Sequence, residues 1–245
     1  MLLVLLAAAV GALAGPMLRA RIFRHSVPAE QWVRTDCPSC GHRLVPGGWR
    51  GLVTVLPPTG RCPGCRERVG PAFGLVEATG AASFAVLALV GGSWLELAAF
   101  WWIAAAGVAL VFIDVAVHRL PDSLTLSAFA GALVLLGAAA LVDDRLSGFG
   151  LAVLYGLALA FCYLVLVLVY PAGLGLGDVK LALVLGLALG WFGGVVVVLG
   201  AAAGFLLAGL YAAALLVLRR VGRKDSIAHG PAMLGGALVA LVVVA

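Results

Sequence analysis

Long apolar stretches recur along this chain, and they constrain its fold more than any other feature. The chain has 245 residues, of which 64% are hydrophobic and 11% are charged. A helix needs about 20 apolar residues to cross the roughly 30 Å hydrocarbon core of a bilayer. Backbone N–H and C=O groups in a bilayer must form their hydrogen bonds within the protein, so only helices and closed barrels can span it. The alternating pattern of barrel strands is absent. The sequence therefore predicts an all-α polytopic protein embedded in a lipid bilayer.

Eight stretches are interpreted as transmembrane helices, with a small polar module between the first two. Trp191 to Gly194 form only a weak break, so a chain with seven spans is the alternative. In a secretory signal, basic residues precede the apolar stretch. None precedes the first stretch here, so a retained membrane anchor is expected. The predicted spans are residues 1–18, 74–92, 96–113, 124–142, 149–169, 178–192, 194–217 and 230–245. The predicted domains are the first helix (1–18), a cytoplasmic cysteine module (19–73) and a membrane core (74–245).

The basic residues predict which side of the membrane each loop faces. If both chain ends are outside, every Lys and Arg except Arg145 falls on the cytoplasmic side, as the bias of basic loops toward the cytoplasm requires. Glu96, Asp143 and Asp144 are then assigned to outer loops. The net charge of +5 reflects this topology. No nucleic-acid motif is present, so no nucleic-acid partner is expected.

The polar module contains two CxxC pairs, Cys37-Pro-Ser-Cys40 and Cys62-Pro-Gly-Cys65, with 21 residues between them. Four thiolates at this spacing are typical of a tetrahedral Zn²⁺ site. Two disulfides are the alternative, but the module is assigned to the reducing cytoplasm, where stable disulfides are rare. Structural zinc is the prediction, because four sulfur ligands leave no open position for a substrate. His42 is interpreted as a solvated loop histidine.

Three aspartates lie at the ends of predicted spans, where a charge is costly unless it has a partner or a function. Asp114 follows the third span, Asp122 precedes the fourth and Asp178 opens the sixth. The predicted topology brings all three to the cytoplasmic ends of their helices. Two carboxylates that share a proton around a water can act as general base and general acid. We expect the helix dipoles to favour the anionic form of Asp178 and the protonated form of Asp114.

The residues around Asp178 and one glutamate are the supporting candidates. Gly175 and Gly177 allow a tight bend and a close approach of the backbone to a substrate strand, and helix-packing glycines are the alternative. Lys180 cannot share a helix face with Asp178, so it is expected to reach the membrane surface or to bind a substrate group. Glu77, near the start of the second span, is either a helix N-terminal residue or a functional one.

These motifs, in this order, closely resemble the type IV prepilin peptidases, which are intramembrane aspartic proteases of the GxGD type. The resemblance implies that Asp114 and Asp178 are the catalytic pair and that Asp122 supports the site. The matching residues are Ile113-Asp114, Leu120-Pro121-Asp122, Gly175-Leu-Gly-Asp178-Val-Lys180, the two CxxC pairs, Val76-Glu77 and Gly230-Pro231.

The resemblance also implies a bacterial inner-membrane enzyme with its active site facing the cytoplasm. Its expected substrates are type IV prepilins and pseudopilins, from which it would remove the short basic leader next to the leader's glycine. Many members with the tetracysteine loop also methylate the new N-terminal amine with S-adenosylmethionine. This chain departs from the family pattern between Gly11 and Arg19, where the usual asparagine is missing, and between Val45 and Arg50, where the usual asparagine-isoleucine-proline pattern is missing. Both segments lie in the part of the chain that the resemblance associates with methyl transfer. S-adenosylmethionine is therefore expected as a cofactor only if this second activity is retained.

Two other classes of function stay open from the residues alone. A proton-coupled transporter also uses intramembrane aspartates, but usually near the midplane between internal repeats, and neither feature is found in the sequence. A zinc-stabilised membrane scaffold would use the cysteines and leave the aspartates without a role. A short distance between Asp114 and Asp178 would favour the protease over both alternatives.

Overall fold

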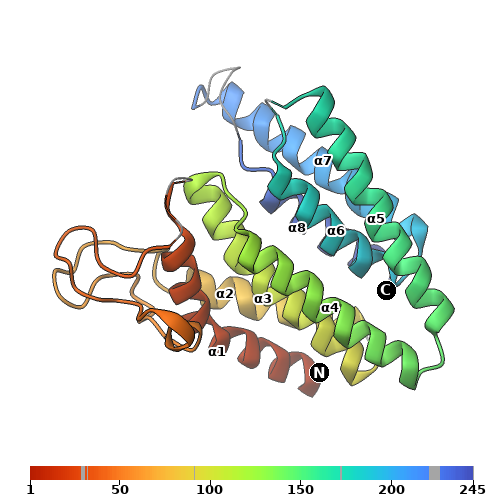
Figure 1. Ribbon diagram of the computed structural model, residues 1–245, viewed down its shortest axis with the longest axis horizontal. Coiled ribbons are helices and arrows are strands. Elements are labelled where there is room, and N and C mark those ends of the chain that lie inside the picture. The colour runs from red at the N-terminus through yellow and green to blue at the C-terminus, as the bar shows by residue number, and fades with distance from the viewer. Residues whose placement is uncertain (29–30, 32, 91, 172, 221–226, 245) are drawn as a thin grey trace. The chain divides into compact units, whose positions relative to one another are not determined.

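The computed structural model is helical, with one irregular module after the first helix (Figure 1). It describes residues 1–245 except 29–30, 32, 91, 172, 221–226 and 245. Within the described residues the chain forms eight α-helices and one short 3-10 helix, and no β-strand. Arg223 and Lys224, which the topology assigns to a cytoplasmic loop, lie outside the described residues.

Each predicted span corresponds to one helix. The break from Trp191 to Gly194 separates α6 from α7, which confirms eight helices rather than seven. The first helix continues beyond the predicted end at residue 18 as far as His25. The elements are α1 (Leu2–His25), η1 (Gly48–Leu52), α2 (Leu75–Val90), α3 (Trp94–Val117), α4 (Asp122–Val142), α5 (Leu146–Val169), α6 (Leu176–Gly190), α7 (Gly194–Val217) and α8 (Gly230–Val244).

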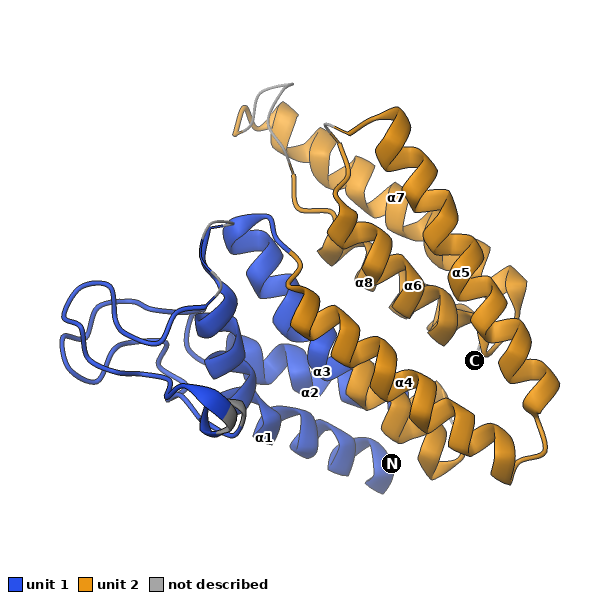
Figure 2. Ribbon diagram, in the orientation of Figure 1, with its two compact units in different colours: residues 1–88, 104–119 blue, residues 89–103, 120–245 orange. Residues whose placement is uncertain are grey.

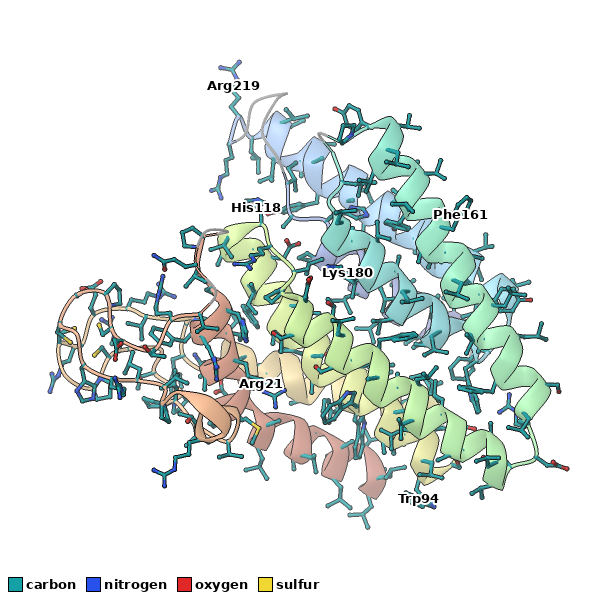
Figure 3. The ribbon with its side chains drawn as sticks, in the orientation of Figure 1. Arg21, Trp94, His118, Phe161, Lys180 and Arg219 are labelled. Atoms are coloured by element: carbon teal, nitrogen blue, oxygen red, sulfur yellow. The ribbon has the colours of Figure 1, made fainter. Side chains whose placement is uncertain are left out.

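Five of the described helices, α1, α3, α4, α5 and α7, are long and apolar enough to cross a membrane. Helices α2, α6 and α8 have 16, 15 and 15 residues and are shorter than a full span. Phe161 of α5 and Trp94 of α3 are 65% and 76% exposed in the protein alone (Figure 3), as expected for side chains that face lipid. The chain is a multi-pass membrane protein.

The chain divides into two compact units (Figure 2). The first unit contains residues 1–88 and 104–119, and so holds α1, the cysteine module, α2 and the second half of α3. The second unit contains residues 89–103 and 120–245, which hold the first half of α3 and the helices from α4 to α8.

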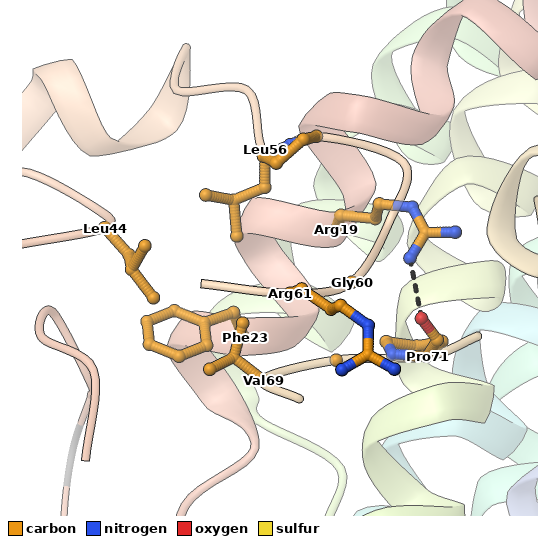
Figure 4. A pocket seen from close by; sticks show the side chains of 10 residues that line it. Arg19, Phe23, Leu44, Leu56, Gly60, Arg61, Val69 and Pro71 are labelled. Atoms are coloured by element: carbon orange, nitrogen blue, oxygen red, sulfur yellow. Dashed lines mark hydrogen bonds between the residues drawn. The ribbon is translucent and has the colours of Figure 1, made fainter. Parts of the chain in front are cut away.

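In the first unit, the cysteine module packs against the second half of α1. Phe23 of α1 forms a small apolar core with Leu44, Leu56 and Val69 of the module. Figure 4 shows these side chains around a small cavity between α1 and the module. The backbone N–H of Leu56 also donates to the carbonyl oxygen of Pro16, 2.9 Å away. The module is therefore attached to the membrane helix by apolar contacts and by a backbone hydrogen bond.

In the second unit, α6 is the central helix and packs against α4, α5, α7 and α8 (Figure 1). Leu181, Ala182 and residues 184–190 are buried, which explains why this helix is apolar on every side. Small residues allow the close packing, because a Cβ on Gly186 would lie 2.8 Å from the Cα of Gly156 in α5. This packing places the first turn of α6, with Asp178, against the core of the unit.

The second unit also contains an ion pair that the sequence did not predict. Glu96 lies in the first turn of α3, not in a loop, and is only 6% exposed. Its Oε1 atom accepts a hydrogen bond of 3.3 Å from Arg145. The Arg145 guanidinium also lies 4.7 Å from the ring centroid of Trp191, which is a cation–π distance. Arg145 thus joins the beginning of α3 to the end of α6.

Candidate active site and metal centre

The four cysteines of the module converge on one point. Their Sγ atoms all lie within 4.8 Å of one another, and the Cys37–Cys65 and Cys40–Cys62 pairs are each 3.7 Å apart. A disulfide would require about 2.0 Å, whereas Zn–S bonds of about 2.3 Å in a tetrahedron separate the sulfurs by about 3.8 Å. All four thiols are free, so the geometry fits a four-sulfur metal centre and not two disulfides. His42 is not one of the clustered ligand groups.

The two CxxC segments share one backbone conformation. The N–H groups of Gly41 and Arg66 donate to the carbonyl oxygens of Cys37 and Cys62, in both cases at 2.9 Å. Gly41 and Arg66 have left-handed φ values of 69° and 61°, a conformation that disfavours the arginine. Backbone hydrogen bonds, first from Ser39 and then from Cys40, lower the pKa of Cys37 to about 7, which favours its thiolate form. The pKa of Cys65 moves in the other direction, to about 12, because burial and the three neighbouring thiols outweigh a backbone hydrogen bond from Glu67.

A buried ion pair connects the end of the module to α1 and α2. Arg19 is 2% exposed, and its Nε and Nη2 atoms each donate a 2.7 Å hydrogen bond to the carboxylate of Glu77. Its Nη1 and Nη2 atoms also donate to the carbonyl oxygens of Pro71 and Ala72, each at 2.9 Å. Glu77 therefore binds Arg19 in the structure, and a functional role for Glu77 stays a prediction.

Asp178 lies in the first turn of α6 and is only 8% exposed. The backbone N–H of Gly175, the residue before the helix, donates to its Oδ2 atom at 2.8 Å. The N–H of Asp178 donates in turn to the Gly175 carbonyl at 3.0 Å. These two bonds fix the direction of the carboxylate at the helix N-terminus, where the dipole favours a negative charge. Its other oxygen, Oδ1, takes no part in them.

Gly177 explains why the stretch before Asp178 needs a glycine. A Cβ at this position would lie 2.9 Å from the Cβ of Leu120, which is too close for any residue other than glycine. A Cβ at Gly175 would meet nothing nearer than Asp178 Oδ2 at 3.8 Å. Gly177 therefore lets the start of α6 approach the residues that precede α4. Neither glycine has a left-handed φ, so close packing is the reason, rather than a special turn.

Asp122 and Lys180 form an ion pair between α4 and α6. Lys180 Nζ lies 2.6 Å from Asp122 Oδ1, and the two side chains are 39% and 62% exposed. Lys180 projects from the first half of α6 (Figure 3), two residues after Asp178. In the structure the partner of Lys180 is thus a carboxylate of the chain itself, and the expected binding of a substrate group by Lys180 stays a prediction. Asp122 is the first residue of α4 and does not precede the helix.

Asp114 lies within the last turns of α3, whereas the hydropathy pattern placed it just after the helix. It is 5% exposed, and its carbonyl oxygen accepts the N–H of His118 at 2.8 Å. His118 has a left-handed φ of 50° and follows the last helical residue, Val117. Asp114 belongs to the first unit and Asp178 to the second. The pairing of the two carboxylates stays a prediction.

Comparison with known proteins covers most of the chain. Residues 97–217 match the type IV leader peptidase family, and residues 9–90 match the bacterial peptidase A24 N-terminal domain. A prepilin leader peptidase/N-methyltransferase of Aeromonas hydrophila is 33% identical over 216 residues, which cover 85% of this chain and 71% of that relative. The chain belongs to the type IV leader peptidase family.

Other members of this leader peptidase family are longer than the chain. A prepilin leader peptidase/N-methyltransferase of Burkholderia pseudomallei (strain K96243) is 33% identical over 161 residues. That match covers 64% of this chain and 51% of the relative, so the chain spans about half the length of this relative. No solved structure matches the chain. Of the candidate residues, the four cysteines and Glu77 lie in the matched N-terminal domain, and Asp114, Asp122, Gly175, Gly177, Asp178 and Lys180 lie in the matched peptidase segment.

One histidine near the start of α6 was not singled out from the sequence. His229 directly precedes α8 and lies beyond both matched segments. Its Nε2 atom is 3.4 Å from the hydroxyl oxygen of Tyr163 in α5, and its ring packs against Phe205 of α7 with a centroid distance of 5.3 Å. Burial lowers the pKa of His229, and the nearby charge of Asp178 opposes this effect. Its position just before Gly230-Pro231, a motif of the resemblance, was the only signal in the sequence.

Proposed function

We propose that this chain is an intramembrane aspartic endopeptidase that removes the basic leader from type IV prepilins or pseudopilins. The reaction would take place at the cytoplasmic face of a bacterial inner membrane, where the basic loops are predicted to lie. Membership of the leader peptidase family supports the reaction class. The observation that carries the proposal is Asp178, a carboxylate that is nearly buried yet has its direction fixed by Gly175 at the start of the central helix.

Hydrolysis by this site needs two carboxyl groups, and we assign them to Asp114 and Asp178. One ionised carboxylate accepts a proton from a water molecule, whose oxygen then bonds to the carbonyl carbon of the scissile peptide. The other, protonated, carboxyl group donates its proton to the leaving nitrogen, and the C–N bond breaks. The proton balance is restored because each carboxyl group ends in the state in which the other began. Both groups are buried, and burial strengthens their interaction with reacting atoms.

The cysteine centre would hold one Zn²⁺ ion through Cys37, Cys40, Cys62 and Cys65. Bound zinc would supply a cross-link for a module of about 50 residues that has only a small apolar core. Four protein ligands fill a tetrahedral ion, so the centre would leave no position for a substrate. We therefore propose a structural role for it.

The test is cleavage of a prepilin by the purified chain in detergent, followed by mass spectrometry of the product. Wild type, Asp114→Asn and Asp178→Asn are compared, with Asp144→Asn as a matched control. Asp144 is exposed and already has the left-handed φ of 53° that asparagine tolerates. Wild type and the control should shorten the substrate by its leader, and the two other variants should not. Cleavage by Asp178→Asn at the wild-type rate would refute the proposal and favour a scaffold or transporter.

N-methylation is a second candidate activity, because the chain matches relatives that are named as both leader peptidases and N-methyltransferases. The same mass measurement tests it when S-adenosylmethionine is supplied. A methylated product would be about 14 Da heavier than the cleaved, unmodified product. Cleavage without this increase would leave the chain with the peptidase activity alone.

A further inference from the structure

Arg119 connects the end of α3 to the residues that follow α1, and all of these residues belong to the first unit. Its Nη1 atom donates to the carbonyl oxygens of Pro28, at 3.2 Å, and of Gln31, at 2.9 Å. The two acceptors lie 91 and 88 positions earlier in the chain. They also belong to one turn, because the N–H of Gln31 donates to the Pro28 carbonyl at 3.0 Å. One guanidinium nitrogen thus joins the connection after α3 to the chain between α1 and the cysteine module.

The two acceptor carbonyls lie between points where the chain is attached to α1. Before them, Val27 is fully buried, and its N–H donates to the carbonyl oxygen of His25 at 2.9 Å. After them, the N–H of Arg34 donates to the carbonyl oxygen of Arg24 at 2.8 Å, and the Arg34 guanidinium lies 5.5 Å from the ring centroid of Phe23. Arg119 therefore bonds to a part of the chain that is itself held by α1.

On the other side of Arg119 is the turn that ends α3. Asp114 is 5% exposed, and its carbonyl oxygen accepts the N–H of His118 at 2.8 Å. His118, at the end of α3 in Figure 3, has a left-handed φ of 50°. A residue other than glycine adopts this conformation at a cost in free energy, so the surrounding contacts must hold it in place. Arg119 is the next residue, and its two hydrogen bonds are such contacts.

We propose that Arg119 is a positioning residue for Asp114, and that it fixes the last turn of α3 by attaching the connection after this helix to the chain after α1. This inference rests on the proposed peptidase function, in which Asp114 is one of the two catalytic carboxyl groups. The last carbonyl groups of a helix have no partner within the helix, so the final turn unwinds more readily than the rest. Asp114 lies three residues before the last helical residue, Val117, so unwinding of this turn would move its carboxyl group. Misplacement of a catalytic group by about 1 Å can cost about 100-fold in rate.

The test combines the kinetics of prepilin cleavage with hydrogen exchange, both measured on the full chain in detergent. Arg119→Met removes both hydrogen bonds and keeps much of the side-chain length. We expect kcat to fall by roughly tenfold while KM stays within about twofold, because the loss affects catalytic geometry and not substrate binding. The amide proton of His118, which bonds to the Asp114 carbonyl, should exchange faster than in wild type. Arg119→Lys retains a charged donor and should recover part of the lost kcat.

Arg34→Met is the matched control, because it is the same substitution at a nearby arginine whose guanidinium contacts Phe23 of α1. Its kcat and the exchange of the His118 amide should match those of wild type. A higher KM with an unchanged kcat in Arg119→Met would show that Arg119 binds substrate and would overturn the inference. A lower kcat without faster exchange would also overturn it, because Arg119 would then not act through the last turn of α3. A wild type that cleaves no prepilin would instead overturn the proposed function itself.

Discussion

The cysteine module and the first turn of α6 are both built around polar groups at the ends of apolar helices, but they use these groups differently. The four thiols point at one another, with sulfur contacts of 3.7 Å, and two of the four cysteines are buried. Asp178 instead has one oxygen bonded to Gly175 and a second oxygen outside that bond. A site whose ligands satisfy one another is suited to holding a structure together, whereas a carboxylate with a remaining oxygen is suited to chemistry.

Removing the cysteine ligands should give the largest effect on stability. Cys37→Ser combined with Cys62→Ser removes one ligand from each CxxC pair, and structural zinc sites contribute on the order of 10 kcal/mol to folding. We expect the double variant to bind no zinc and residues 37–69 to exchange their amide protons rapidly. Cys162→Ser is the matched control, because Cys162 is an exposed residue of α5 outside the cluster. Full zinc occupancy in the double variant would contradict the four-sulfur centre.

Breaking the Arg19–Glu77 pair should give the next largest effect, because it separates the module from the membrane helices. Arg19→Met leaves the Glu77 carboxylate without its bidentate partner. Loss of one member of a fully buried pair costs about 3–5 kcal/mol, and because the Glu77 side chain is 18% exposed, the expected cost lies at or below the lower end of that range. The thermal unfolding midpoint in detergent should fall clearly. Arg19→Met combined with Glu77→Leu should recover much of the loss, since no unpaired charge then remains. Equal unfolding midpoints for the single and double variants would show that the unpaired Glu77 charge is not the cause of the lost stability.

At the start of α6, Gly177→Ala should reduce catalysis more than stability. The added Cβ would lie 2.9 Å from Leu120, and overpacking of this kind costs about 1–3 kcal/mol. Because the strain would displace the turn that carries Asp178, we expect kcat/KM to fall by about 10-fold to 100-fold. Adding Leu120→Ala should restore part of the activity. Gly209→Ala is the control, because its Cβ would meet nothing within 4 Å, and an equal loss in that variant would contradict the packing explanation.

The exposed Asp122–Lys180 pair should give the smallest change. Its side chains are 62% and 39% exposed, and pairs of this kind contribute about 0–1 kcal/mol. Lys180→Met should therefore lower the unfolding midpoint by only a few degrees, and added salt should reduce the difference between the variant and wild type. A loss as large as that of Arg19→Met would mean that Lys180 has a further partner or role.

The features that the sequence predicted correctly depend on local pattern. Apolar runs gave the eight helices, and the Trp191 to Gly194 break was visible because glycines interrupt an apolar run. The two CxxC pairs predicted the cysteine cluster because each short turn fixes two ligands in advance. The end of α3 was misplaced because the charge of Asp114 was taken as the end of the apolar run, whereas the helix continues through Asp114 to Val117.

The features that the sequence missed depend on contacts between distant helices. Glu96 and Arg145 are separated by 49 positions, and Tyr163 and His229 by 66. Neither pair belongs to a motif, and neither can be inferred until the packing of the helices is known. Lys180 was expected to reach the membrane surface or to bind a substrate group, whereas its partner in the structure is Asp122, which lies 58 positions away on α4. Residue spacing in the sequence therefore could not predict the roles that arise from helix packing.

Zinc content and prepilin cleavage should be measured on the same purified sample of Asp178→Asn. If the cysteine centre maintains structure and Asp178 performs chemistry, the variant keeps its zinc and loses its cleavage activity. The predicted result is about one zinc per chain, an unfolding midpoint near that of wild type, and no detectable cleavage. Wild-type cleavage by this sample, with zinc bound, would instead show that the catalytic step does not depend on Asp178.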